Sequence, residues 1–136
     1  MVGSAVSRLF KKKDCENNSS NIILKPNRKE LNLLEEQSVS KWFDKNRPSI
    51  VIVAAAKVGG IYANSHMPFG FLNENLKIQS NIINSSYSSG VKRLLFLGSS
   101  CIYPKFAQQP IKEDYLLKGE LEATNEWYAI AKIAGI

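Results

Sequence analysis

The stretch LLFLGSSCIYPK, residues 94–105, is the clearest indicator of the fold. An apolar run passes into a glycine and two serines, a pattern typical of a buried parallel strand that ends in a loop. A second stretch, SIVIVAAA at residues 49–56, is apolar on both faces. It predicts a central strand of the same sheet.

Helices are predicted over residues 3–13, 35–46 and 68–88, where apolar residues recur about every 3.6 positions. Their expected buried stripes are Ala5, Val6, Leu9 and Phe10 in the first, Val39, Trp42 and Phe43 in the second, and Leu72, Leu76, Gln79 and Ile83 in the third. A polar loop at 14–20 and a short strand at 21–26 complete the pattern. The alternation predicts an α/β fold with a doubly wound parallel sheet.

Composition limits the class of protein. The 136 residues are enough for one domain, and no apolar run reaches the roughly 18 residues that a membrane span needs. Cys15, Cys101 and His66 are dispersed, so no metal site is expected and a cytoplasmic protein is the simplest interpretation. His66 is expected in an exposed loop.

The net charge is +6, and residues 1–30 hold seven basic against three acidic side chains. Two interpretations stay open: a solvated helix end at Lys11, Lys12 and Lys13, or a surface for phosphate or nucleic acid.

A proton-transfer motif lies near the end of the chain. TNEWYAIAKIAGI, residues 124–136, predicts a helix capped by Thr124 or Asn125. Tyr128 and Lys132 then lie one turn apart on one face, where a nearby ammonium is expected to lower the pKa of the phenol from about 10. Such a tyrosine can exchange a proton at a carbonyl. From the spacing alone, an amphipathic helix with a surface lysine is the alternative.

Three segments carry a family resemblance. Residues 94–105, AAAKVGGIYAN at 54–64 and EATNEWYAIAKIAGI at 122–136 closely resemble the GDP-L-fucose synthases, which belong to the extended short-chain dehydrogenase/reductases. The resemblance implies a Rossmann-like fold and NADP as cofactor. It also implies a nucleotide-sugar substrate, GDP-4-keto-6-deoxy-D-mannose, which a homodimeric enzyme epimerises at C3 and C5 and then reduces at C4. The alternatives are another nucleotide-sugar epimerase or dehydratase of the superfamily, or a basic nucleotide-binding module without catalysis.

The resemblance also implies four catalytic residues. Tyr128 protonates the C4 oxygen, and Lys132 orients it and holds the nicotinamide ribose. Ser99 is chosen over Ser100 because Tyr103 follows it by four residues, as in the family pattern. Cys101 pairs in the family with a histidine downstream of residue 136, for epimerisation.

Cofactor-binding residues are implied at the carboxyl ends of the strands, where loops 25–33, 54–64 and 98–104 are expected to meet. Arg28 is expected at the 2′-phosphate, with Lys25 and Lys29 as substitutes. The full set is Gly3, Arg28, Asn32, Ala54, Ala55, Ala56, Leu97, Gly98, Ser99 and Lys132. Lys57 is expected either to face the phosphate or the sugar of a ligand, or to contact no ligand. Gly59, Gly60 and Asn64 are expected beside the sugar, and Leu33 under the adenine or in the core.

The fold is expected to be incomplete at both ends. MVGSAV resembles the tail of a glycine-rich turn that retains only Gly3, and no strand precedes it. Residues 1–136 are therefore interpreted as a partial NADP-binding domain without the C-terminal substrate-binding domain, inactive alone. Exposed sheet edges and apolar helix faces are expected to follow.

Overall fold

The computed structural model describes residues 1–17 and 21–136. The helices are α1 (Val2–Glu16), α2 (Glu36–Asn46), α3 (Ile61–His66), α4 (Pro68–Ser88) and α5 (Glu126–Ala134), and the strands are β1 (Ile50–Val53) and β2 (Arg93–Phe96). Two 3₁₀ turns, η1 (Ser100–Ile102) and η2 (Glu113–Tyr115), lie between β2 and α5. The three helices predicted at 3–13, 35–46 and 68–88 are thus confirmed, and so is the helix that carries Tyr128.

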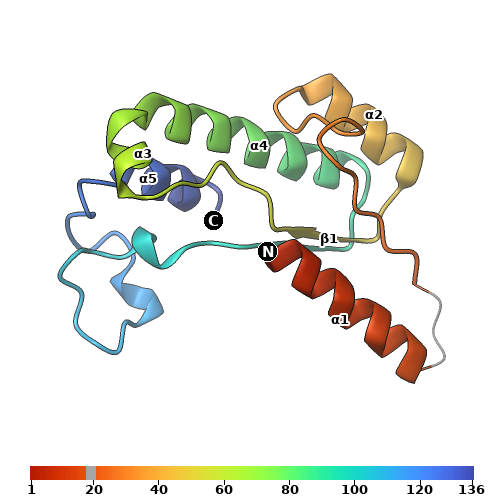
Figure 1. Ribbon diagram of the computed structural model, residues 1–136, viewed down its shortest axis with the longest axis horizontal. Coiled ribbons are helices and arrows are strands. Elements are labelled where there is room, and N and C mark those ends of the chain that lie inside the picture. Colours follow the sequence, from red (N-terminus) through yellow and green to blue (C-terminus); the bar gives the residue numbers. More distant parts are fainter. Residues whose placement is uncertain (18–20) are drawn as a thin grey trace.

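The two strands form a parallel pair, with Ile50 opposite Arg93 and Val53 opposite Phe96. Figure 1 shows α1 on one side of this pair and α2, α4 and α5 on the other. Helices therefore cover both faces, and the predicted Rossmann-like, doubly wound parallel arrangement is confirmed as a partial sheet.

The strand predicted at residues 21–26 is wrong. This segment is extended but unpaired among the described residues, with Ile22 87% and Leu24 42% exposed. A strand needs a neighbour for its ladder of hydrogen bonds, and Pro26 lacks a donor. The polar loop predicted at 14–20 is shortened because α1 continues to Glu16; residues 18–20 lie outside the described residues.

The core lies where α2 and α4 meet the sheet. Its buried residues are Leu31, Val39, Phe43, Val53 and Ile82, and Leu33 and Trp42 pack against them. The predicted inward stripe of α2 is therefore confirmed, and Leu33 belongs to the core. Each fully buried aliphatic or aromatic side chain of this kind stabilises the fold by about 1.5–3 kcal/mol.

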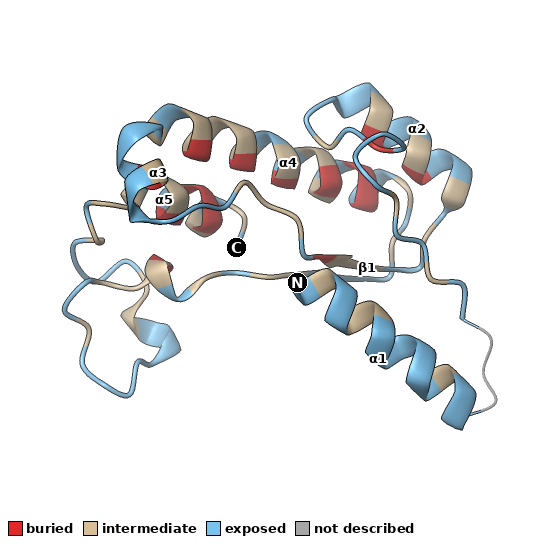
Figure 2. Cartoon of the chain, viewed as in Figure 1, coloured by how far each residue is buried: buried red, intermediate tan, exposed pale blue. Residues whose placement is uncertain are grey.

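The buried face of α4 differs from the predicted one. Figure 2 shows buried residues along the side that faces the sheet and α5. They are Phe71, Asn75, Gln79, Ile82, Ser85 and Ser86. Gln79 is confirmed, whereas Leu72, Leu76 and Ile83 are half-buried flanking residues. The prediction followed apolar residues, but polar side chains can occupy a buried face when they hydrogen-bond to backbone groups.

Both strands are less buried than their sequences indicate. Leu95 is 53% and Ile50 55% exposed, and α1 has no buried residue. In a two-stranded sheet each strand is an edge, so the expected central, buried position of these strands is wrong here. The exposed apolar surface expected of an incomplete sheet is observed. No helix in residues 1–17 and 21–136 is long and apolar enough to span a membrane.

Candidate active site

Lys132 is the best-anchored charged group of the site. Its side chain is 4% exposed, and its Nζ donates a hydrogen bond to the carbonyl oxygen of Leu97 at 2.9 Å. The same Nζ lies 4.5 Å from the centroid of the Phe96 ring and 5.9 Å from that of Tyr128. The end of β2 and one face of α5 are thereby joined at this ammonium.

Ser99 and Cys101 lie where the chain leaves β2. Cys101 Sγ is 3.1 Å from Ser99 Oγ, which also accepts a hydrogen bond from the backbone N–H of Cys101 at 3.5 Å. This side-chain cap starts η1, which contacts α5. The predicted catalytic residues Ser99, Cys101, Tyr128 and Lys132 therefore come together, although they are distant in sequence.

The pKa of Tyr128 is raised above its ordinary value of 10.0, chiefly by burial and further by the neighbouring Cys101. A hydrogen bond with Ser99 acts in the opposite direction. The net direction is opposite to the lowering that was expected from Lys132. The Lys132 ammonium lies 5.9 Å from the centroid of the Tyr128 ring and donates a hydrogen bond to Leu97. Tyr128 is a neutral phenol at neutral pH, the form that donates a proton.

Burial also lowers the pKa of Lys132 from 10.5, and the neighbouring Cys101 partly offsets this. Desolvation disfavours the charged form of both groups. Perturbed titratable groups gathered beside a strand end are typical of sites that move protons.

The expected cofactor edge is built from small residues. A Cβ added at Gly3 would lie 3.7 Å from the Cβ of Ala54, so the start of α1 lies at the carboxyl end of β1, as Figure 1 shows. A Cβ at Gly98 would lie 4.0 Å from Cδ1 of Ile136, the nearest atom that it would meet in residues 1–17 and 21–136. Ala54 and Gly98 are exposed, while Ala55, Ala56 and Leu97 are half-buried. A ligand can approach the backbone closely along this edge.

Arg28 and Asn32 lie apart from the catalytic group, in the segment that Leu31 anchors to the core. Both are exposed. The amide of Asn32 donates to Glu35 Oε1 at 2.7 Å and accepts from the N–H of Leu34 at 3.1 Å. Asn32 thus stabilises the turn before α2, a role that the sequence analysis did not assign.

Loop 54–64 is held by two buried amides that the sequence analysis did not emphasise. Asn75 accepts from the N–H of Lys57 at 2.8 Å and donates to its carbonyl at 3.0 Å. Asn64 donates to the carbonyls of Gly59 and Gly60 at 2.9 and 3.1 Å. Lys57 pairs with the carboxylate of Glu74. The sequence signal that could have identified Asn75 was a polar amide within the long amphipathic helix predicted at 68–88.

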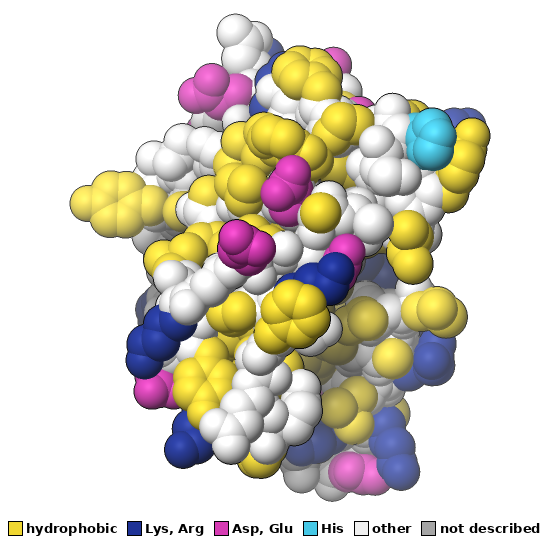
Figure 3. Space-filling view, turned by 90° about the vertical axis from the view of Figure 1, so that its left-hand side faces the viewer, with side chains coloured by type: hydrophobic (Ala, Val, Ile, Leu, Met, Phe, Trp, Pro, Cys, Tyr) yellow, Lys and Arg dark blue, Asp and Glu magenta, His cyan; other side chains and the backbone are white. Residues whose placement is uncertain are grey.

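His66 is exposed, as predicted, but it ends α3 and is not in a loop. Its ring stacks on Tyr62 with centroids 4.0 Å apart, and Figure 3 shows the imidazole at the surface beside apolar side chains. Within residues 1–17 and 21–136, no three His, Cys, Asp or Glu side chains gather as metal ligands do.

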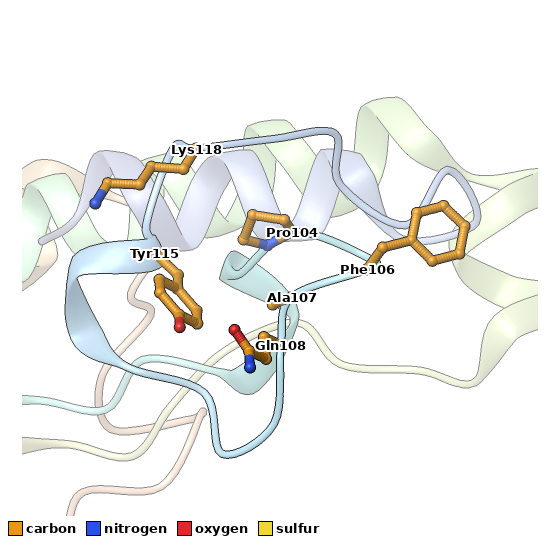
Figure 4. A pocket seen from close by; sticks show the side chains of 6 residues that line it. All are labelled: Pro104, Phe106, Ala107, Gln108, Tyr115 and Lys118. Atoms are coloured by element: carbon orange, nitrogen blue, oxygen red, sulfur yellow. The ribbon is translucent and has the colours of Figure 1, made fainter.

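A shallow hollow of about 280 Å³ lies in the loop between η1 and α5 (Figure 4). Pro104, Phe106, Ala107, Gln108, Tyr115 and Lys118 line it. The loop is closed by a bond from the N–H of Lys105 to the carbonyl of Glu120 at 2.8 Å and by an ion pair between Lys105 and Glu122 at 2.9 Å. The residues that line the hollow come after Ser99 in the sequence.

A parallel α/β fold with a tyrosine and a lysine one turn apart beside a strand-end serine defines the class of short-chain dehydrogenase/reductase domains. The sequence profile of the NAD dependent epimerase/dehydratase family matches residues 1–136. The chain belongs to that family.

Curated relatives agree with this assignment. The chain is 54% identical over 136 residues to GDP-L-fucose synthase of Sinorhizobium fredii and 52% identical over 137 residues to that of Escherichia coli K12. Each alignment covers 100% of this chain and 41% of the relative. The chain thus spans about two-fifths of the length of these relatives.

Solved structures give the same result. A GDP-L-fucose synthetase from Naegleria fowleri bound to NADP matches with a TM-score of 0.84 at 30% identity, over 97% of this chain and 41% of that one. A GDP-mannoheptose C4 reductase from Campylobacter jejuni with NADP bound matches with a TM-score of 0.88 at 38% identity, over 98% of this chain and 40% of that one.

Proposed function

We propose that this chain forms the NADP-binding and catalytic part of a GDP-L-fucose synthase. The reaction is conversion of GDP-4-keto-6-deoxy-D-mannose to GDP-L-fucose by C3/C5 epimerisation and C4 reduction. The observation that carries the proposal is the convergence of Tyr128, Lys132, Ser99 and Cys101 at the end of β2. Relatives more than 50% identical over the whole chain carry the GDP-L-fucose synthase name.

NADP fits the residues present. The small residues Gly3, Ala54 and Gly98 leave the carboxyl edge of the sheet open, and the positive end of the α1 dipole lies at that edge. Arg28 is an exposed cation that can pair with a 2′-phosphate. Asn32, Ala55, Ala56 and Leu97 would complete the contacts with adenine and ribose. When bound, NADPH supplies the hydride for C4.

Tyr128 acts in this proposal as the general acid for the C4 oxygen. Because burial raises its pKa, the phenol is protonated at neutral pH and has a proton to give as negative charge develops on that oxygen. Ser99, a hydrogen-bond partner of Tyr128, holds the same oxygen. Lys132, fixed by the carbonyl of Leu97, orients the tyrosine and holds the nicotinamide ribose.

Cys101 acts at the carbons flanking the ketone. Its thiolate form would take the proton from a carbon α to the C4 carbonyl, which leaves an enolate and the neutral thiol, and inversion is completed when a second acid, in the family a histidine, delivers a proton to the opposite face. Its Sγ is 3.1 Å from the hydroxyl of Ser99. A substrate whose C4 oxygen is held by Ser99 would therefore lie close to the thiol of Cys101.

A second candidate is another GDP-sugar reductase of the same family. Campylobacter jejuni proteins named GDP-6-OMe-4-keto-L-xylo-heptose reductase and GDP-D-glycero-L-gluco-heptose synthase match with TM-scores of 0.82 and 0.83, each at 37% identity. The difference between these substrates lies in the sugar, so assaying several GDP-sugars distinguishes the two candidates.

A chimera tests the proposal. Residues 1–136 replace the matching 137 residues of the Escherichia coli enzyme, and NADPH oxidation and GDP-L-fucose formation are measured. We expect turnover with GDP-4-keto-6-deoxy-D-mannose and a homodimer by light scattering. A folded chimera that binds NADPH but turns over only a heptose substrate would support the second candidate, and one without turnover on any GDP-sugar would refute both.

A further inference from the structure

The ring of Phe96 lies directly against the ammonium of Lys132. The distance from Nζ to the ring centroid is 4.5 Å, within the range of a cation–π interaction. The next residue of the chain supplies a second contact, because the carbonyl of Leu97 accepts a hydrogen bond from the same Nζ at 2.9 Å. The last residue of β2 and its successor therefore hold one ammonium together.

The tip of the same ring is wedged against Gly135. A Cβ added at Gly135 would lie 2.7 Å from Cζ and 2.9 Å from Cε1 of Phe96. Non-bonded carbon atoms do not approach this closely, so any side chain at position 135 would displace the Phe96 ring. Gly135 is the C-cap of α5, three residues after Lys132, and its N–H donates to the carbonyl of Lys132 at 3.2 Å. One ring thus contacts a turn of the helix at two points.

Gln79 of α4 contacts the same last turn of α5. It is 5% exposed, and its Nε2 donates to the carbonyl of Ala131 at 2.7 Å. Its Oε1 would lie 2.9 Å from a Cβ at Gly135. The amide from α4 therefore fixes the turn of α5 that carries Lys132, and Phe96 fills the space beneath it.

We propose that Phe96 is a positioning residue for Lys132, with an aromatic face that holds the ammonium beside Tyr128 and stabilises its charged form. The inference rests on the proposed function only in giving Lys132 a catalytic role. The titratable groups that face the ammonium are Cys101 from η1 and Tyr128 from α5. The side chains that β2 and α4 contribute to this arrangement, Phe96 and Gln79, are neutral. Phe96 therefore acts on a charge that burial disfavours.

An NMR titration of Lys132 in the chimera with the Escherichia coli enzyme tests this. The pKa and the ¹³Cε and ¹Hε shifts of Lys132 are measured with natural Phe96, with 3,5-difluorophenylalanine at position 96 and in Phe96→Leu. Fluorination weakens the ring quadrupole while nearly preserving the shape of the ring. The Lys132 pKa should fall by about half a unit in the fluorinated protein. The ring-current shift of the ε protons should decrease in Phe96→Leu to the part that the Tyr128 ring causes.

Phe106 provides the matched control. Its ring lies 5.6 Å from the Nζ of Lys105 and is 86% exposed, so difluorophenylalanine at position 106 should leave the Lys132 pKa unchanged. An unchanged Lys132 pKa in the protein fluorinated at position 96 would overturn the proposal. If Phe96→Leu does not fold, the fluorinated protein decides, because it retains the packing.

An NADPH titration of the same samples separates this inference from the proposed function. If the Lys132 pKa responds to Phe96 but the chimera binds no NADPH, the positioning role stands and the proposed function loses support. If NADPH binds and the Lys132 pKa does not respond, the positioning role is refuted and the proposed function is untouched.

Discussion

The Nζ of Lys132 donates to the carbonyl oxygen of Leu97 across 35 residues of sequence. This bond joins α5 to the end of β2 and determines where the ammonium lies relative to Tyr128. It places the cation 5.9 Å from the centroid of the Tyr128 ring. Burial is the largest contribution to the raised pKa of that tyrosine, so its phenol is protonated at neutral pH.

Tyr128→Phe removes the proposed acid. In the chimera we expect the rate of C4 reduction to fall by about 10²–10⁴-fold, the usual contribution of a general acid, while the Kd for NADPH stays near that of the parent chimera. Tyr62→Phe is the control, because Tyr62 is 75% exposed on α3. Normal turnover in Tyr128→Phe would show that another group protonates the oxygen.

Cys101→Ser separates epimerisation from reduction. A serine hydroxyl ionises far less readily than a thiol, so exchange at C3 and C5 should be lost before hydride transfer is impaired. The measurement is deuterium incorporation from D₂O into the GDP-sugar, followed by NMR. Cys15→Ser, on the exposed face of α1, should incorporate deuterium at the parent rate. Equal incorporation in Cys101→Ser would exclude the thiol as the base.

Arg28→Ser tests cofactor preference. A cation beside the adenine ribose favours the 2′-phosphate of NADPH, so the chimera carrying this change should bind NADPH about tenfold more weakly, a loss of about 1.4 kcal/mol, with NADH affinity unaltered. Lys29→Ser, at the next residue in the same exposed turn, is the charge-matched comparison. A larger effect at Lys29 would transfer the phosphate contact to that residue.

Gly59 and Gly60 form a matched pair for loop packing. A Cβ at Gly59 would lie 2.8 Å from Phe71 Cζ and 3.0 Å from the Cβ of Ala63, whereas one at Gly60 would have no atom of the described residues, its chain neighbours aside, within 4 Å. Gly59→Ala should therefore lower the free energy of unfolding by about 1–3 kcal/mol, as overpacking does. Gly60→Ala should lower the free energy of unfolding by less, and urea denaturation of both variants measures the difference. Equal losses would mean that backbone conformation, and not the Phe71 contact, demands glycine.

The pH dependence of stability reports on the two buried groups. The Lys132 pKa lies below 10.5 in the folded protein, so the unfolded state binds more protons just below pH 10.5 and stability rises with pH there. The Tyr128 pKa lies above 10.0, so its contribution is present below pH 10.0 and is lost as pH rises through the folded pKa.

Urea unfolding between pH 7 and 11 checks both signs. Lys132→Met should remove the rise that approaches pH 10.5, and Tyr128→Phe should remove the fall that begins above pH 10.0. Lys77→Met, at an exposed position of α4, is the control for loss of a positive charge. A Lys132→Met protein with the parent pH profile would contradict the burial argument.

The sequence by itself determined the local features. Pro68 at the start of α4 and Gly90 after its end set the bounds of that helix, because proline suits a first turn and glycine tolerates a positive φ, here 72°. Tyr128 and Lys132 share a face because they are four residues apart on α5. The apolar runs at 50–53 and 94–97 indicated parallel strands, and these form as β1 and β2.

Tertiary structure decided what depends on neighbours. Residues 21–26 have strand-forming side chains but no partner strand among the described residues. A strand makes its backbone hydrogen bonds with a neighbouring strand, so the sequence of one segment does not show whether it pairs. The buried face of α4 is set by backbone groups that accept from Asn75 and Gln79. The raised pKa of Tyr128 and the place of Phe96 beneath Lys132 depend on burial and on contacts between β2 and α5. Periodicity gives the residues that share a face, but only packing determines what that face meets.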